Sequence, residues 1–297
     1  MQRIAFAGIG NMGWPMAANL VKAGFDVVVS DISAERVARF ASEVGGHAAA
    51  SPAEAAAGAE VFLCILPTSK EVAQVADAVL PSLTEGSLFI DMTSGNPTRT
   101  REIAARLATR GVRMVDCPVS GGVSRAKSGE LAIMAGGAPS DLDAAEPILR
   151  AMATSIHRCG ETGAGQAMKA LNNLVSAGGF LIGIEALLIG QKLGLEPGLM
   201  VDVLNASTGM NNSTQKKFRQ FVLSRRFDSG FGLDLMVKDL SIAIEVGKEA
   251  GVPTPLAALT RELWAAAATH LGAGEDHTAV AKLSERLANQ TLVGGNT

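Results

Sequence analysis

The chain contains no tyrosine, and its 297 residues include only three cysteines and four histidines. Without tyrosine, a phenolic hydroxyl cannot serve as the acid of a catalytic site. The cysteines, Cys64, Cys117 and Cys159, are odd in number and widely spaced, which argues against a disulfide framework and favours a reducing compartment such as the cytoplasm. The histidines form no pair with the spacing of metal ligands, so no metal site is expected.

An excess of charge of one sign is also lacking, because 26 lysines and arginines face 29 aspartates and glutamates. A general nucleic-acid binder would need a basic face, so this balance argues against such a partner. The first residues lack the charged region and cleavage site of a signal peptide. The longest apolar stretch, around 174–190, contains Ser176, Glu185 and several glycines, which predicts a buried helix and no membrane span.

Short β-rich runs alternate with helical patterns in the first half of the chain, which predicts a doubly wound, mostly parallel sheet of the Rossmann type. The predicted strands are 3–8, 26–30, 61–66, 87–91, 113–116 and 131–135. Strand signals stop near residue 162, and the predicted helices beyond it are 164–194, 197–205, 211–223, 233–250, 254–269 and 277–290. We therefore expect an α/β domain over 1–162 and an all-helical domain over 163–297, opened by the long interdomain helix 164–194.

Three glycines, Gly8, Gly10 and Gly13, spell G-x-G-x-x-G between the first predicted strand and the helix that follows it. Gly8 permits a tight turn, Gly10 lets the backbone approach a pyrophosphate, and Gly13 lets the helix pack closely on the strand. The helix N-terminus offers free N–H groups and a partial positive charge to the phosphates. This motif in this context predicts that the first domain binds a dinucleotide.

The run DVVVSD (26–31), which contains the second predicted strand, ends at Asp31, 18 residues after Gly13, near the spacing of an acid that binds the ribose. A carboxylate at this place accepts hydrogen bonds from a ribose 2′-hydroxyl and repels a 2′-phosphate. We therefore expect NAD as the cofactor. NADP stays possible, because Arg36 could turn toward a phosphate.

Lys169 precedes Asn173 by four residues in the run GAGQAMKALNN (163–173), so both side chains lie on one face of the predicted helix. The helix is apolar or small nearly all round, which predicts that the lysine is buried. Burial lowers the pKa of a lysine, because the charged form loses its hydration. Such an amine can take the proton of an alcohol while a nearby dinucleotide takes the hydride. Lys238 is a candidate second cation beside it.

The segment DCPVSGG (116–122) follows a predicted strand, at the edge where open α/β sheets bind ligands. Ser120 offers a hydroxyl, and Gly121 and Gly122 allow close approach to their N–H groups. This combination suits a carboxylate, although an ordinary turn would explain it equally well.

DMTSGNP (91–97) likewise combines a strand end with hydroxyl residues and a turn, and Ser94 stands just after the strand. Leu66 and Pro67, in ILP (65–67), stand at the end of another predicted strand and are expected to form a wall of the cofactor cleft. His277 is interpreted as a residue of a helix start in preference to a ligand or a base.

Together these motifs resemble those of the β-hydroxyacid dehydrogenases, the group of 3-hydroxyisobutyrate dehydrogenase and tartronate semialdehyde reductase. The resemblance covers essentially the whole chain. The segments that carry it are GIGNMGWPMAANL (8–20), DMTSGNP (91–97), DCPVSGGVSRAKSGEL (116–131), GAGQAMKALNN (163–173), MVKDL (236–240) and EDHTAVAKLSERL (275–287).

The resemblance implies an NAD(P)-dependent oxidoreductase that interconverts a small 3-hydroxy acid and its semialdehyde, with Lys169 as the catalytic acid and base. The residues implied to hold the substrate are Ser120, Gly121, Gly122 and Asn173. The residues implied to contact the cofactor are Gly8, Gly10, Asn11, Met12, Gly13, Asp31, Leu66, Pro67, Ser94 and Lys238. Members of the family form dimers or tetramers through the helical domain, so the resemblance also implies a homo-oligomer.

Several alternatives stay open at this point. The substrate could be 3-hydroxyisobutyrate, tartronate semialdehyde, L-serine, threonate or succinic semialdehyde, and the sequence does not fix the direction of the reaction. Enzymes that decarboxylate 6-phosphogluconate are longer and have histidine where this chain has Asn172, and imine reductases usually replace the lysine found here as Lys169. A non-catalytic dinucleotide-binding scaffold is the alternative from a different class, and it would tend to lose that lysine.

The chain departs from the family pattern at two places. Glu130 stands where a small hydroxyl residue is usual, and the segment NASTGMNNSTQKKF (205–218) has no assigned counterpart. We expect Gly209–Ser213 to help close the substrate pocket, and the amides there suggest a polar group at the far end of the substrate.

Overall fold

The computed structural model describes residues 2–293 and divides into two compact units, Met1–Lys169 and Ala170–Thr297. The first unit is an α/β fold and the second is helical, which confirms the predicted fold class. Helix α8 (Ala164–Lys192) begins in the first unit and continues into the second, so the division falls inside one helix. The expected domain boundary after residue 162 stays a prediction.

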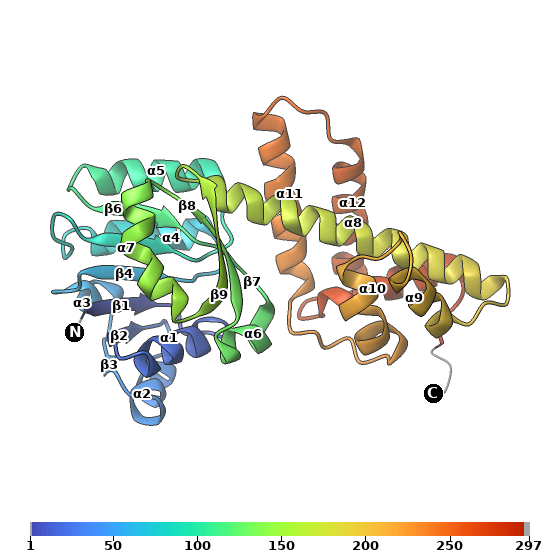
Figure 1. The fold of residues 1–297 in the computed structure, drawn as a ribbon, viewed down its shortest axis with the longest axis horizontal. Helices are drawn as coiled ribbons and strands as arrows, with labels where there is room; N and C mark the ends of the chain where they lie inside the picture. Colours follow the sequence, from blue (N-terminus) through green and yellow to red (C-terminus); the bar gives the residue numbers. More distant parts are fainter. Residues whose placement is uncertain (1, 294–297) are drawn as a thin grey trace. The chain divides into compact units, whose positions relative to one another are not determined.

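The described residues of the first unit form a nine-stranded sheet in the order β3-β2-β1-β4-β5-β6-β8-β7, with β9 paired to β8 (Figure 1). Neighbouring strands from β3 to β6 are parallel, whereas β8 is antiparallel to β6 and β7. Because the order runs outward from β1 in both directions, the sheet is doubly wound. The strands are β1 (Arg3–Ala7), β2 (Asp26–Ser30), β3 (His47–Ala48), β4 (Val61–Cys64), β5 (Leu88–Asp91), β6 (Arg113–Asp116), β7 (Val119–Ser120), β8 (Leu131–Gly136) and β9 (Ala153–Gly160).

Both faces of this sheet are covered by helices, which is why its central strands are almost continuously apolar. Ile4 and Phe6 of β1 belong to one buried cluster, and Ala5 and Ala7 belong to another on the opposite face. Helices α1, α2, α6 and α7 contribute to the first cluster, and α3, α4 and α5 to the second. Their bounds are α1 (Gly13–Lys22), α2 (Ala34–Glu43), α3 (Pro52–Ala56), α4 (Ser69–Val79), α5 (Pro97–Ala108), α6 (Gly122–Ser128) and α7 (Pro139–Arg150).

Three strands, β3, β7 and β9, lie outside the predicted set. The first two have only two residues each, too few to show an alternation of apolar and polar side chains. Among the described strands, β9 pairs only with β8, and most of its side chains are partly or fully exposed. Its sequence therefore lacks the apolar run that marks a strand covered on both faces.

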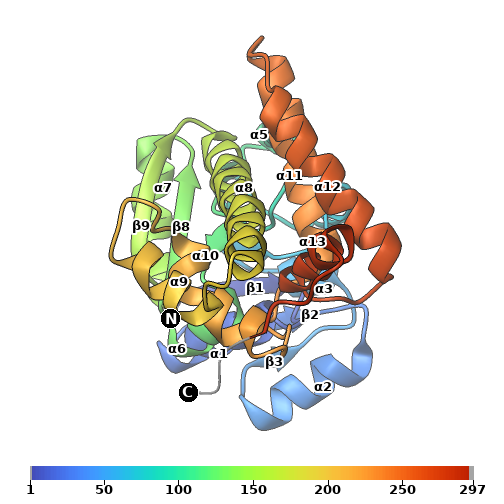
Figure 2. The same cartoon turned by 90° about the vertical axis from the view of Figure 1, so that its right-hand side faces the viewer.

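The second unit is a bundle of helices around Phe180, Phe218 and Trp264, and the ring of Phe180 meets each of the other two edge to face. Helices α11 and α12 pack side by side (Figure 2). The predicted helix 211–223 is two elements, because a π-helix follows α10 directly. The elements after α8 are α9 (Pro197–Asn205), α10 (Asn212–Lys216), the π-helix η1 (Phe218–Leu223), α11 (Leu233–Glu249), α12 (Pro255–Leu271), the 3-10 helix η2 (His277–Val280) and α13 (Ala281–Ala288).

Among the described helices, α8 is long and apolar enough to cross a membrane by length and composition, and half of its most apolar window is buried. The core helix of a soluble protein meets the same criterion. Phe180, Ile184 and Leu187 of α8 are fully buried in the core of the second unit. The helix therefore acts as a core helix of the bundle in this structure.

Candidate active site

The Gly-rich turn between β1 and α1 is built as the sequence predicts. Gly8 has a φ of +91°, and a Cβ placed there would lie 2.3 Å from the carbonyl oxygen of Ile65. A Cβ at Gly13 would lie 1.8 Å from the carbonyl oxygen of Gly8, so this contact between helix and strand admits only glycine. Apart from its chain neighbours, no atom of the described residues lies within 4 Å of a Cβ at Gly10, which leaves space for a ligand beside its backbone.

The N-terminus of α1 is suited to phosphate groups. Within the described part of the chain, no side chain caps this helix at Met12, and no acidic residue stands in its first turn. Its positive end is therefore not neutralised by the protein. Asn11 and Met12 precede the helix at this end. The turn and the helix together fit a dinucleotide pyrophosphate.

Asp31 follows β2 and lies beside the Gly-rich turn. Its carboxylate accepts hydrogen bonds from the backbone N–H of Ile9 at 2.9 Å and of Ser33 at 3.0 Å. Arg36 forms an ion pair with the same carboxylate at 2.9 Å. Asp31 therefore shapes the turn and holds the arginine that could otherwise reach a 2′-phosphate.

The ends of β4 and β5 are joined by side-chain hydrogen bonds. The backbone N–H of Leu66 donates to the Thr93 hydroxyl at 2.9 Å, and the N–H of Thr93 donates to Asp91 at 2.9 Å. Asp91 and Thr93 are buried. This fixes the loops that carry Leu66, Pro67 and Ser94 at the carboxyl edge of the sheet.

Ser120 ends β7, and two glycines with positive φ follow it. The φ values are +130° at Gly121 and +67° at Gly122, where α6 begins. Both values favour glycine. The segment thus turns sharply just after the strand, as a loop that presents backbone N–H groups would.

Asp116, which the sequence-based site did not include, caps the start of α8. Its two carboxylate oxygens accept hydrogen bonds from the backbone N–H of Gly163 at 2.6 Å and of Gln166 at 2.8 Å. The residue is fully buried. Burial raises the pKa of its carboxyl group to about 7 against the opposing effect of these two hydrogen bonds, and the nearby Asp91 raises it further.

Gln166, also outside the predicted site, ties the same helix to the loop after β5. Its amide oxygen accepts from the N–H of Gly95 at 2.7 Å, and its amide nitrogen donates to the carbonyl of Thr93 at 2.8 Å. Gln166 is only 1% exposed. The loop that carries Ser94 is thereby held to the turn of α8 that immediately precedes Lys169.

Lys169 is 7% exposed and Asn173 6% exposed, which confirms the predicted burial of the lysine. The amide nitrogen of Asn173 donates to Asp239 at 2.5 Å, and Lys238 forms an ion pair with the same aspartate at 3.2 Å. Asp239 is a second buried acid that sequence reasoning missed, and it orients the Asn173 amide. Its signal in the sequence was its place in the segment MVKDL (236–240), as a charged residue among apolar neighbours.

The structure also shows where His277, Glu130 and the segment Gly209–Ser213 lie. His277 is the first residue of η2, as expected, and is buried. Its ring stacks on that of Trp264, with 6.2 Å between the ring centroids. Burial lowers the pKa of this histidine. Glu130 is exposed and accepts from Ser128 at 2.8 Å. Asn211, within Gly209–Ser213, caps α10. The closing of a pocket by that segment stays a prediction.

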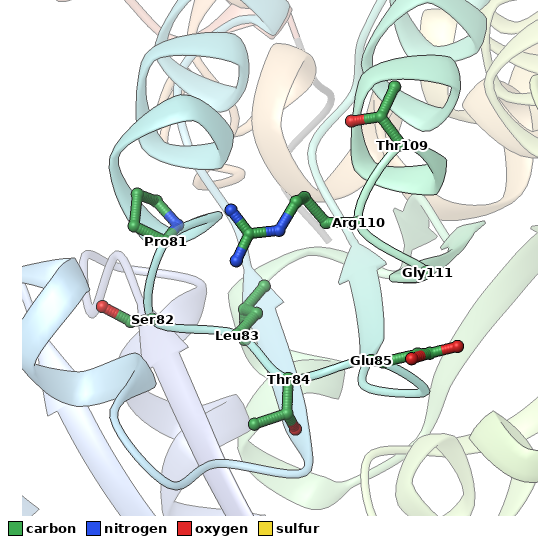
Figure 3. A pocket seen from close by; sticks show the side chains of 8 residues that line it. All are labelled: Pro81, Ser82, Leu83, Thr84, Glu85, Thr109, Arg110 and Gly111. Carbon is green, nitrogen blue, oxygen red and sulfur yellow. The ribbon is translucent and has the colours of Figure 1, made fainter.

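A separate surface hollow lies at the opposite edge of the sheet, before β5 and β6 begin (Figure 3). Apart from Lys169 on α8, the predicted site residues of the first unit lie at the carboxyl ends of the strands, so this hollow belongs to a different part of that unit. Its lining residues are Pro81, Ser82, Leu83, Thr84, Glu85, Thr109, Arg110 and Gly111. Over residues 2–293, the acidic, histidine and cysteine side chains form no cluster that could hold a metal ion.

Two family models match the chain. Residues 3–160 match the NAD binding domain of 6-phosphogluconate dehydrogenase, and residues 163–284 match the NAD-binding domain of NADP-dependent 3-hydroxyisobutyrate dehydrogenase. The chain belongs to the β-hydroxyacid dehydrogenase family. The predicted family, the NAD(P) cofactor and the enzymatic nature of this dehydrogenase are thereby confirmed, and the non-catalytic scaffold is set aside.

Relatives of this dehydrogenase cover nearly its whole length. It is 35% identical to 2-(hydroxymethyl)glutarate dehydrogenase of Eubacterium barkeri, over 99% of this chain and 98% of the relative. It is 36% identical to 3-hydroxyisobutyrate dehydrogenase of Pseudomonas aeruginosa, over 93% of this chain and 95% of the relative. The structure of Mycobacterium tuberculosis 3-hydroxyisobutyrate dehydrogenase with L-serine superposes with a TM-score of 0.89 at 36% identity, covering 96% of this chain and 99% of that one.

Proposed function

We propose that this dehydrogenase interconverts a small 3-hydroxy acid and its semialdehyde, with Lys169 as the acid and base. Bound NAD supplies a nicotinamide ring that accepts the hydride from the alcohol carbon. The neutral amine of Lys169 accepts the hydroxyl proton, so the C–H and O–H bonds break and a C=O double bond forms. In reverse, the ammonium form of Lys169 returns the proton to the developing alkoxide.

The observation that carries this proposal is the burial of Lys169 on a helix whose start is fixed. Asp116 and Gln166 hold the first turn of α8 to the carboxyl edges of β5 and β6. Dinucleotides bind at that edge of a doubly wound sheet. A proton acceptor must stay within hydrogen-bond reach of its substrate, and an anchored helix meets that need.

The substrate is held by the groups predicted from the sequence. The substrate carboxylate binds the hydroxyl of Ser120 and the N–H groups of Gly121 and Gly122. Asn173, oriented by Asp239, shares the substrate hydroxyl with Lys169. The relatives are named for 3-hydroxyisobutyrate and 2-(hydroxymethyl)glutarate, and both compounds carry a hydroxymethyl group beside a carboxylate.

Tartronate semialdehyde, L-serine, threonate and succinic semialdehyde are the other candidate substrates of the proposed site. The M. tuberculosis relative was solved with L-serine, which favours keeping this amino acid among the candidates. On the cofactor side, we favour NAD over NADP, because Asp31 lies at the end of β2 and holds Arg36 in an ion pair.

We also infer that the protein forms a homodimer or homotetramer through its helical unit. Val175, Ile182 and Ile189 recur every seven residues along α8 and are 76%, 64% and 63% exposed. Such a stripe follows one side of a helix, and an extended exposed apolar surface marks an interface.

Replacing Lys169 tests the proposed reaction. In the Lys169→Met variant, turnover of 3-hydroxyisobutyrate should fall by about a hundredfold to ten-thousandfold, because no group of similar reach can accept the proton. The Kd of NAD should stay nearly unchanged. NADH formation, followed by its near-ultraviolet absorbance, and fluorescence titration with NAD measure the two quantities.

The matched control is Lys248→Met on α11, which removes an exposed lysine from the surface. This control should retain the turnover of the unaltered protein. A Lys169→Met variant with turnover close to normal would show that another residue accepts the proton.

A further inference from the structure

The segment that departs from the family pattern, 205–218, lies directly against α8. A Cβ at Gly183 would lie 2.6 Å from the ring of Phe218, and a Cβ at Gly179 would lie 3.3 Å from the amide of Asn211. The Asn211 amide also donates to the carbonyl of Gly179 at 3.4 Å. Two glycines of α8 therefore let this segment approach the helix more closely than larger side chains would allow.

Lys217 stands at the junction of α10 and the π-helix η1, where this close approach occurs. Its backbone departs from helical geometry, with φ −129° and ψ −44°. Its ammonium group donates to the hydroxyl of Ser176 at 3.2 Å and lies 5.9 Å from the centroid of the Phe180 ring. A surface lysine normally extends into water, whereas this one is partly buried along α8.

The place where Lys217 contacts α8 is on the face that carries Asn173. Successive spacings of four, three and four residues separate Lys169, Asn173, Ser176 and Phe180. Side chains at such spacings share one face of a helix. The ammonium of Lys217 is therefore held by residues that continue the row of Lys169 and Asn173.

Distance along the helix indicates the size of molecule that could reach Lys217. Ser176 lies about 4.5 Å farther along the axis than Asn173, at about 1.5 Å per residue. A carbon–carbon bond spans about 1.5 Å. A hydroxy acid bound at Asn173 would thus reach the ammonium group with a second acidic group at the end of a chain of about two or three further carbons.

We propose that Lys217 makes this enzyme select hydroxy acids with two carboxylates, and that it binds the distal carboxylate together with Ser176. The inference rests on the proposed function, which places the reacting hydroxyl at Lys169 and Asn173. A carboxylate–ammonium hydrogen bond is among the strong ones in proteins. The Ser176 hydroxyl adds a second donor on the same helix face.

The test compares two substrates that differ only at the distal end. 3-Hydroxyisobutyrate carries a methyl group where 2-(hydroxymethyl)glutarate carries a propanoate arm. The unaltered enzyme should show the higher kcat/KM with the dicarboxylate. In Lys217→Met, kcat/KM for the dicarboxylate should fall by about tenfold to a hundredfold, mainly through KM, while 3-hydroxyisobutyrate is little affected.

Two further variants control for misfolding. Lys216→Met removes the exposed neighbouring lysine of α10 and should leave both substrates unaffected. Lys217→Arg keeps the positive charge and should retain most of the preference for the dicarboxylate. Equal losses for the two substrates in Lys217→Met, with Lys217→Arg no better, would overturn the inference.

The outcomes separate this inference from the proposed function. If the unaltered enzyme oxidises 3-hydroxyisobutyrate but does not prefer the dicarboxylate, the role of Lys217 is wrong and the proposed function stands. If it oxidises no 3-hydroxy acid at all, the proposed function fails and the inference fails with it.

Discussion

The carboxylate of Asp31 is shared among three donors, two backbone N–H groups and the guanidinium of Arg36. The negative charge stands at the end of β2, where the adenosine ribose binds in doubly wound folds. The same charge restrains Arg36, whose side chain is 42% exposed. We therefore expect this one residue to contribute to both sides of the choice between NAD and NADP.

Neutralising Asp31 should shift the cofactor preference. In Asp31→Asn, the repulsion of a 2′-phosphate is removed and Arg36 is released, so the ratio of kcat/KM for NAD to that for NADP should fall by about tenfold. Steady-state kinetics with both cofactors measure the ratio. Glu35→Gln, which removes an exposed acid of α2, should leave it unchanged. An unaltered ratio in Asp31→Asn would place the ribose elsewhere.

At the scale of single residues, sequence reasoning predicted the burial of Lys169 and the tight contacts of Gly8 and Gly13. It missed Asp116, Gln166 and Asp239. The partners of Asp116 lie 47 and 50 residues away in the chain. An acidic residue at the end of a strand is common, so it does not stand out in a sequence. That Asp116 caps α8 becomes visible only when the structure shows this later helix beginning beside the strand.

The first turn of α8 is capped by a buried acid, Asp116. The pKa of Asp116 is raised from 3.8 to about 7, so the folded state holds this proton more tightly than the unfolded chain does. The resulting stabilisation is complete below about pH 4 and is lost as the pH rises through about 7. A shift of this size corresponds to about 4 kcal/mol.

Asp116→Asn should remove this pH dependence. Its free energy of unfolding should vary less between about pH 4 and pH 7 than that of the unaltered protein. The variant should also be less stable by about 1–3 kcal/mol, because its amide nitrogen would face a backbone N–H donor. Urea unfolding at several pH values measures both effects. Asp228→Asn, at an exposed site, should keep the original profile, and identical profiles for Asp116→Asn would refute the role of this acid.

Among the helices and strands, the long apolar patterns gave the most accurate predictions. The helix predicted at 197–205 is α9 (Pro197–Asn205), and β2 matches the predicted strand 26–30. The π-helix η1 was not predicted; in the structure the ring of Phe218, its first residue, packs against Gly183 of α8. Local sequence carries no signal for such a contact.

At the scale of the whole molecule, the order of elements predicted the doubly wound sheet and the helical second half. The two-residue strands β3 and β7 and the exposed strand β9 could not be predicted, since none of them shows a periodic pattern of apolar residues. The identity of the substrate could not be predicted either, because the proposed carboxylate-binding loop would suit many hydroxy acids.

The assembly of the molecule can be tested through the apolar stripe of α8. Ile182→Glu places a charge in the middle of the stripe, at a side chain that is 64% exposed. Burying that charge in an interface is costly, so the variant should have a lower molar mass than the unaltered protein by light scattering. Leu256→Glu on α12, at a residue that is 78% exposed, is the matched control. Equal masses for all three proteins would exclude this stripe as the interface.

The start of α8 also has a consequence for exchanging parts between relatives. A Cβ at Gly165 would lie 2.3 Å from the carbonyl oxygen of Met134, so the opening turn fits one particular strand edge. A chimera could join the sheet of this protein to the helices of a relative at the loop before α8. The first turn of that helix would then come from the relative and would no longer match the strand that it packs against. Grafting a new bundle calls for a splice inside the helix, beyond Lys169.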